Sequence, residues 1–195
     1  KRSLTIIGGQ RALHIAWSFA ASVIIARLLT PEEIGVFSVC ASLVAIAHVF
    51  REFGVGSYLI QERELTRERI RSALAVMFCF SWTIGIGLFF GRYQIASFYD
   101  NLELVNVISV LALNFFLIPI SSPVLSILRR NLRFGTVAGI SLVSSFVATA
   151  GSVIMAYLGY GPASLAWGSV AGIVVTIMMS TYFHPPEVPC LPGFS

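Results

Sequence analysis

Three charged residues interrupt long apolar stretches of the sequence, at Arg11 and at the adjacent pair Arg51 and Glu52. A charge inside a membrane costs on the order of 3 kcal/mol, so it normally faces a cavity or a partner. The planar guanidinium fork of arginine binds two phosphate oxygens at once. Arg11 and Arg51 are therefore candidate substrate-binding residues of a cationic pocket. Glu52 lies about 100° away from Arg51 around a helix and is a candidate coupling or structural charge.

Both arginines also have a simpler interpretation, which the sequence leaves open. Arg11 can extend along the helix to the headgroups at the membrane surface, because its long apolar stem tolerates hydrocarbon. Arg51 can pair with Glu52 or with a group on another helix. In either case the charge would be structural and would bind no ligand.

No sequence pattern of a catalytic, metal or cofactor site is present. In the segment 168–172 the serine directly follows its glycine, unlike the G-x-S-x-G nucleophile motif. The histidines lie on separate segments, and no glycine-rich phosphate loop with a lysine occurs. The cysteines have no redox or metal spacing, and Cys40 and Cys79 suit small packing positions. We therefore expect no enzyme, no metal, no cofactor and no nucleic-acid partner.

The elements that must position these charges are membrane helices. Of the 195 residues, 56% are hydrophobic and 11% are charged, whereas about a quarter are charged in a soluble domain. The apolar runs are continuous and do not alternate, which favours helices over a barrel. The sequence predicts an all-α polytopic membrane bundle with six transmembrane helices, at residues 4–29, 34–60, 72–91, 104–128, 134–158 and 163–183.

Basic residues are distributed unevenly between the predicted loops. If the N-terminus is cytoplasmic, most of them lie on the inner side, at the N-terminus and in segments 63–71 and 129–133. The outer side then holds only Arg27 and Arg92. Cytoplasmic loops are enriched in Lys and Arg, so this orientation is predicted, with the basic loops also contacting anionic lipids. Arg11 would then lie about 10 Å from the inner start of its helix, and both arginines in the cytoplasmic half.

The fourth predicted helix contains Pro119 and Pro123. Each proline removes one backbone donor and disturbs the carbonyl four residues earlier. A kink is expected there, with Ser121 and Ser122 placed to satisfy the freed groups. The kink is either a packing solution or a hinge of a transporter, and the sequence favours neither.

Local patterns predict where several helices begin and touch. Thr30, Pro31 and Glu33 form a capping-box helix start, and Asp100 with Glu103 suggests another. Gly161 and Pro162 precede the last predicted helix. Pairs of glycines four residues apart permit close helix contact, and they occur at 87/91, 135/139 and 168/172.

The segments "ARLLTPEEIGVFSV", "FREFGVGSYLIQERELT" and "LRRNLRF", in this order and spacing, and the closing "PGFS" carry a family resemblance. The chain resembles the Wzx-type, colanic-acid-exporter-like oligosaccharide flippases of polysaccharide and lipopolysaccharide biosynthesis. These belong to the multidrug/oligosaccharidyl-lipid/polysaccharide exporter superfamily. Members have two pseudo-symmetric lobes, and this chain resembles the first. The family usually has aspartate where this chain has Glu52.

The resemblance implies a flippase that moves an undecaprenyl-diphosphate-linked oligosaccharide across the bacterial inner membrane by alternating access. Residues 1–183 would form a six-helix lobe, and the proline-rich residues 184–195 a cytoplasmic linker. The implied partners are the lipid-linked oligosaccharide, membrane lipids, a second six-helix lobe and glycan polymerase machinery. Two alternatives stay open: a drug or small-molecule exporter of the same superfamily, and a non-transporting membrane scaffold.

Overall fold

The computed structural model describes residues 2–52 and 67–183, and within these the side chains of residues 15–49 and 74–183. Every regular element in these ranges is a helix, which confirms the all-α prediction. The helices are α1 (Arg2–Leu28), α2 (Pro31–Glu52), α4 (Arg67–Phe98), α5 (Glu103–Arg130), α6 (Phe134–Tyr157) and α7 (Ala163–Tyr182).

The helix bounds follow the predicted spans closely except at α4. Helix α4 begins at Arg67 and ends at Phe98, so it is longer at both ends than the predicted span 72–91. Arg92, expected in an outer loop, lies inside this helix. The predicted end of the second span, residues 53–60, and the predicted linker 184–195 lie outside the described residues.

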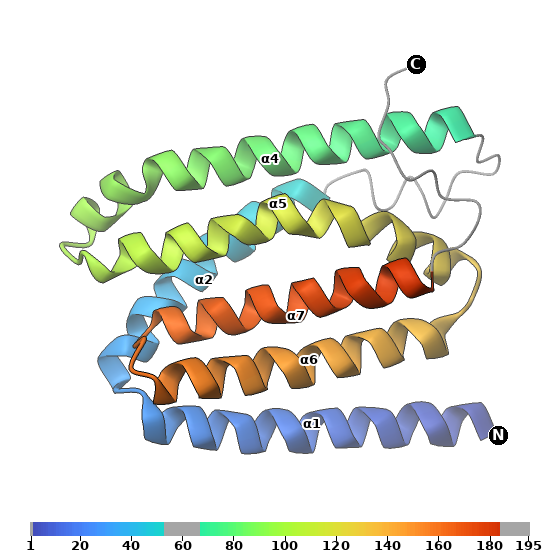
Figure 1. Cartoon of the computed structure of the whole chain (residues 1–195), viewed down its shortest axis with the longest axis horizontal. Coiled ribbons are helices and arrows are strands. Elements are labelled where there is room, and N and C mark those ends of the chain that lie inside the picture. The colour runs from blue at the N-terminus through green and yellow to red at the C-terminus, as the bar shows by residue number, and fades with distance from the viewer. Residues whose placement is uncertain (1, 53–66, 184–195) are drawn as a thin grey trace.

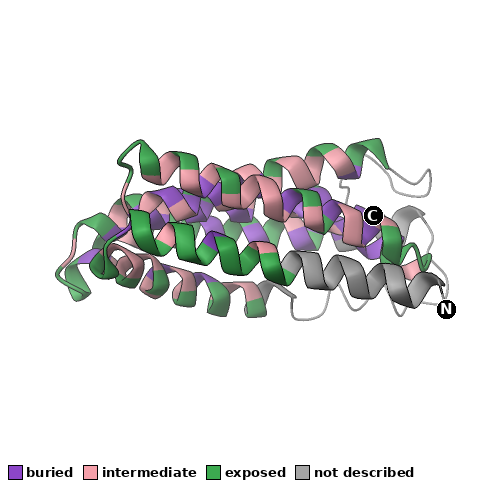
Figure 2. Cartoon of the chain, turned by 90° about the horizontal axis from the view of Figure 1, so that it is seen from below, coloured by how far each residue is buried: buried purple, intermediate pink, exposed green. Residues whose placement is uncertain are grey.

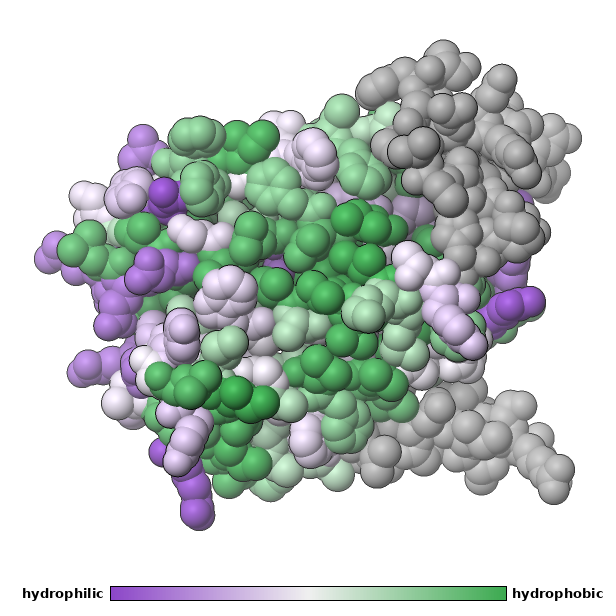
Figure 3. All heavy atoms as spheres, in the orientation of Figure 1, coloured by the Kyte–Doolittle hydropathy of each residue, from purple (hydrophilic) through white to green (hydrophobic). Residues whose placement is uncertain are grey.

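Five of the helices are long and apolar enough to cross a membrane, and they are α2, α4, α5, α6 and α7. The described side chains of α1 include a shorter apolar stretch, Ile15–Leu28. Figure 3 shows hydrophobic side chains over the middle of one face of the bundle, with hydrophilic side chains gathered toward its ends. The chain is therefore a multi-pass membrane protein with a helical bundle fold.

Helix α5 is the centre of the bundle. The helices lie in the order α1, α6, α7, α5 and α4, each beside the next, and α2 crosses behind this row against α5, α4 and α7 (Figure 1). More than half of the apolar stretch of α5 is buried, a larger share than in any other candidate span. Figure 2 shows the buried residues along the middle of the bundle and exposed residues on its outer surface.

The two ends of the bundle differ in charge. We call one the basic end; α1, α4 and α6 begin there and α5 and α7 finish there, whereas α2 ends nearer the middle of the bundle, in the half toward this end (Figure 1). We call the other the acidic end; it carries Arg27 and Arg92 together with Glu32, Glu33, Asp100 and Glu103. Near the basic end the described helices carry Glu68 and a larger number of arginines, which are Arg2, Arg67, Arg69, Arg71, Arg129 and Arg130, and Arg133 directly precedes α6.

The predicted helix starts are confirmed in one case and wrong in another. The Thr30 backbone N–H donates to Glu33 Oε2 at 2.7 Å, and the Glu33 N–H donates to Thr30 Oγ1 at 3.2 Å, which is the expected capping box. Asp100, in contrast, does not cap α5 and has a φ of 51°. The neighbouring Asn101 accepts from the Glu103 N–H at 2.9 Å, because its side chain lies two residues before the first helical residue.

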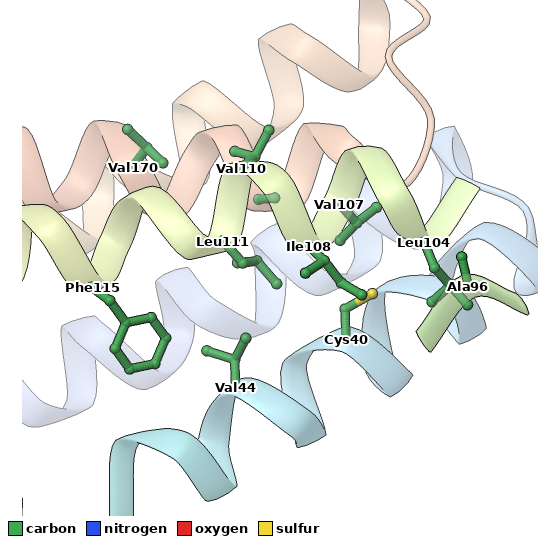
Figure 4. Packing of buried hydrophobic residues seen from close by; sticks show 11 residues of the cluster. Cys40, Val44, Ala96, Leu104, Val107, Ile108, Val110, Leu111, Phe115 and Val170 are labelled. Atoms are coloured by element: carbon green, nitrogen blue, oxygen red, sulfur yellow. The ribbon is translucent and has the colours of Figure 1, made fainter. Parts of the chain in front are cut away.

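Two separate hydrophobic clusters lie along α5. The first, toward the acidic end, joins α5 to α2, α4 and α7, and Figure 4 shows Cys40 and Val44 of α2 facing Ile108, Leu111 and Phe115. The second, toward the basic end, joins Val124, Ile127 and Leu128 of α5 to α4 and α6. The boundary between the clusters falls at the two prolines of α5, so α2 packs only on the first half of this helix and α6 only on the second within these clusters, whereas α4 and α7 contact both.

The three glycine pairs do not all serve helix contact. Gly168 and Gly172 lie on α7 and face Ala148 and Ser152 of α6. A Cβ at Gly172 would lie 2.9 Å from Ala148 Cβ, and a Cβ at Gly168 would overlap Ser152 Oγ. At Gly87, Gly135 and Gly139 a Cβ would meet no atom of the described side chains within 4 Å. The expected close contact is therefore present between α6 and α7, at 168/172, and among the described side chains the other two pairs make none.

Candidate functional site

Pro119 and Pro123 lie inside one continuous helix, α5, and both are buried. In Figure 1 the ribbon of α5 changes direction in the half that leads to the basic end. Proline inside a helix is the ordinary cause of such a bend, because its ring clashes with the carbonyl four residues earlier. The predicted kink thus corresponds to a bend at the boundary between the two clusters.

The carbonyl that Pro119 leaves without a helix donor belongs to Phe115. Ser81 of α4 donates its hydroxyl to this carbonyl at 2.6 Å, and the Ser81 side chain is fully buried. The predicted substitutes are Ser121 and Ser122, and Ser121 instead donates to Ile118 O at 3.3 Å within α5. Sequence reasoning missed Ser81, because its place opposite Phe115 depends on how α4 packs against α5.

The turn of α5 just before the prolines is also joined to α2 and α7. The ring of His48 on α2 stacks on the ring of Phe115, with centroids 4.7 Å apart. The Asn114 Nδ2 group donates to Ser169 Oγ of α7 at 2.9 Å. The Ser169 hydroxyl in turn lies 2.7 Å from Ala166 O, to which it donates its single proton. Residues 114–115 therefore contact three other helices.

Close packing holds α4 and α5 together next to this hydrogen bond. Gly85 lies one turn after Ser81 on the same helix and is buried. A Cβ at Gly85 would lie 3.1 Å from Phe115 Cβ and 3.0 Å from the Phe116 ring. Only glycine permits this approach without displacement of a neighbour, so the Ser81 hydroxyl reaches the carbonyl across a tight helix contact.

The charged candidates occupy the half of the bundle nearer the basic end. Arg11 lies on α1, about 14 Å from the first residue of that helix at 1.5 Å per residue, and Arg51 and Glu52 are the last residues of α2. Among the described residues α1 packs on α6, whereas α2 packs on α5, α4 and α7. The two arginines are thus carried by helices on different parts of the bundle. Their side chains lie outside those described, and their roles stay predictions.

Comparison with known proteins gives the chain a family. Residues 24–190 match the family described as polysaccharide biosynthesis protein. The chain is 26% identical over 174 residues to the teichuronic acid biosynthesis protein TuaB of Bacillus subtilis, covering 85% of this chain and 35% of that protein. No solved structure matches.

Two further relatives are also named for the biosynthesis of a polysaccharide or lipopolysaccharide. The chain is 24% identical over 164 residues to the succinoglycan biosynthesis transport protein ExoT of Rhizobium meliloti, covering 83% of this chain and 32% of that protein. It is 21% identical over 193 residues to the lipopolysaccharide biosynthesis protein WzxC of Escherichia coli, covering 93% of this chain and 38% of that protein. The chain thus spans about a third of the length of the curated relatives it matches. The resemblance deduced from the sequence is confirmed: the chain belongs to the Wzx-like polysaccharide biosynthesis protein family.

Proposed function

We propose that the chain forms a six-helix lobe of a flippase that moves undecaprenyl-diphosphate-linked oligosaccharide across the bacterial inner membrane. The observation that carries this proposal is the family match over residues 24–190, together with relatives named for teichuronic acid, succinoglycan and lipopolysaccharide biosynthesis. One of these relatives is named as a transport protein. Because each relative is about three times as long as the aligned part, a second lobe is expected to complete the pathway.

The charge distribution supports a cytoplasmic basic end. The arginines at the end of α5 and just before the start of α6 lie at the same end of the bundle as the beginnings of α1 and α4, and cytoplasmic loops are enriched in basic residues. In this orientation Arg11 and Arg51 lie in the cytoplasmic half, where the lipid-linked substrate is loaded. Their guanidinium groups suit the two phosphates of the carrier, and Glu52 remains as the coupling or structural charge.

The bend of α5 is the proposed hinge for alternating access. Pro119 and Pro123 lie between two hydrophobic clusters, so a change of angle there would move one cluster relative to the other. A helix that lacks backbone donors at two positions resists such a change less than an intact one.

The test is glycan export in cells that lack their own flippase and produce the protein as its gene encodes it. Arg51→Ala should reduce export about tenfold or more, because hydrogen bonds to a charged group are lost. Arg51→Lys keeps the charge without the fork and should be partly defective. Arg27→Ala, at the acidic end, is the matched control and should export normally. The double variant Pro119→Ala with Pro123→Ala should insert normally and export more slowly.

Each variant is compared at equal membrane level and in the same orientation. A cysteine at Asn101 should react with a reagent applied from the periplasm, and one at Arg133 should not. Wild-type export by Arg51→Ala would refute the phosphate-binding role. Unchanged export by the proline variant would leave the bend as a packing feature. Failure of the wild-type protein to restore glycan export would contradict the flippase proposal and favour the small-molecule exporter or the scaffold.

A further inference from the structure

A buried carbonyl on α5 depends on one side chain of another helix. Pro119 cannot donate to Phe115 O, and Ser81 on α4 supplies a hydroxyl at 2.6 Å. Inside a membrane no water is at hand to replace a lost donor, so an unpaired backbone carbonyl is costly. The need for Ser81 arises from the proline and would disappear if residue 119 carried an N–H.

We propose that Ser81 is a positioning residue that fixes the first half of α5 to α4 and thereby makes the two prolines the point at which α5 bends. The mechanical role in transport rests on the proposed function. The dependence of the α5 geometry on Ser81 does not, and it can be measured without any substrate.

The contacts on either side of the prolines differ in kind. Before Pro119, α5 has directional hydrogen bonds to its neighbours, from Ser81 on α4 and through Asn114 to Ser169 on α7. Beyond Pro123, the second cluster joins α5 to its neighbours through apolar side chains. Apolar contacts carry no directional bond and depend mainly on buried area, so they tolerate a change of angle. The first half of α5 is thus fixed by directional bonds to α4 and α7, whereas the second cluster holds the later part of the helix through apolar contacts that carry no such direction.

Thr83 provides a matched control on the same helix. Its hydroxyl donates to Cys79 O, a carbonyl of its own helix, at 2.7 Å, and the residue is exposed on the bundle surface. Truncation of Thr83 removes a hydroxyl hydrogen bond as truncation of Ser81 does, but leaves no carbonyl without its helix donor. Any general effect of losing a hydroxyl from α4 will therefore appear in both variants.

The first experiment is a double-mutant cycle read by thermal unfolding in detergent. Ser81→Ala should lower Tm by about 2–6 °C, and Thr83→Ala by less than about 1 °C. In a Pro119→Ala background the new N–H at 119 supplies Phe115 O, so the Ser81→Ala shift should fall to less than about half. The same shift in both backgrounds, or none in either, would overturn the proposal. If Ser81→Ala alone does not fold, recovery of folded protein in the double variant supports it.

The second experiment measures the geometry of α5 directly. Spin labels at Leu102 and Leu132, which flank α5 and are 80% and 74% exposed, report its end-to-end distance in a variant without the native cysteines. Ser81→Ala should broaden the distance distribution, and Thr83→Ala should leave it unchanged. Identical distributions for Ser81→Ala and the parent protein would refute the positioning role. Because neither readout involves transport, a failed export assay would reject the flippase proposal and leave this one standing.

Discussion

The helix pairs α6–α7 and α4–α5 are both in close contact, but different features bring their backbones together. Between α6 and α7, Gly168 and Gly172 leave space that is filled by Ala148 and Ser152 of the opposite helix. Neither helix contains a proline. Between α4 and α5, Gly85 again permits close approach, but α5 contains two prolines and its freed carbonyl takes a hydrogen bond from α4.

The two contacts therefore differ in what they provide. Helices α6 and α7 each have an uninterrupted set of backbone hydrogen bonds, whereas the contact between α4 and α5 supplies a hydrogen bond that α5 lacks because of its proline. No proline interrupts α6 or α7, so neither needs the other to complete its backbone hydrogen bonds, and the pair is stabilised by dispersion between closely packed surfaces together with the hydrogen bond between Thr176 and Ser144. In α5 part of the backbone is satisfied only through α4. We therefore expect α6–α7 to behave as a rigid pair and α4–α5 to be the pair through which the bundle changes shape.

The largest effect is expected at the α6–α7 contact, from Gly168→Ala. The added Cβ would overlap Ser152 Oγ and lie 2.8 Å from Ser152 N, a backbone atom that cannot turn aside. The helices must separate, and we expect a loss of about 2–3 kcal/mol in unfolding free energy, measured by thermal unfolding in detergent.

Gly139→Ala on α6 is the matched control for this substitution. A Cβ there meets no described side chain within 4 Å, and alanine is the better helix former, so the variant should be as stable as the parent or slightly more so. If Gly168→Ala were as stable as Gly139→Ala, the α6–α7 contact would not be limited by its glycines, and the contrast between the two pairs would fail.

A smaller effect is expected at the α4–α5 contact, from Gly85→Ala. Its Cβ would lie 3.0 Å from the Phe116 ring and 3.1 Å from Phe115 Cβ, so the neighbours need to move by only a few tenths of an ångström. We expect a loss of about 1 kcal/mol, with Gly87→Ala, which meets no described side chain within 4 Å, as the control. A loss larger than that of Gly168→Ala would show that α4–α5 is the more rigid pair and would reverse the comparison.

The sequence predicts the helices well and their contacts poorly, for a physical reason. Length and continuous hydropathy place all six helices of the described residues, and both hydrogen bonds of the predicted capping box between Thr30 and Glu33 are present. In a membrane, however, helices are apolar on the lipid side as well as on the buried side. The hydrophobic pattern therefore does not indicate which face packs, and nothing distinguishes the pair 168/172 from the pairs 87/91 and 135/139.

Ser81 shows the same limit at the candidate site. A bend at Pro119 follows from the chemistry of proline, and a serine to satisfy the freed carbonyl was expected nearby in sequence. The serine that does so lies 34 residues from Phe115, on another helix. Its role depends on the rotation of α4 about its own axis, which tertiary packing fixes and local sequence does not.

The smallest effect is expected from Thr176→Val. This variant tests whether losing the hydrogen bond to Phe115 O costs more stability than losing another hydrogen bond between helices. Thr176 Oγ1 lies 2.7 Å from Ser144 Oγ of α6 and 2.9 Å from Gly172 O of its own helix. The substitution keeps the shape and removes the hydroxyl. Gly172 O retains its backbone donor within α7, and the Ser144 hydroxyl can turn to a carbonyl of its own helix.

No buried group is then left unpaired, so the loss should be about 0.6 kcal/mol, the average for hydrogen bonds between membrane helices. That corresponds to a Tm shift of about 1–2 °C, below the shift expected for Ser81→Ala. Equal shifts for the two variants would mean that any hydrogen bond between helices of this bundle contributes alike. The stability of the bundle would then depend no more on Ser81 than on Thr176. The contrast between α5, which is interrupted by proline, and the uninterrupted helices α6 and α7 would then have no effect on stability.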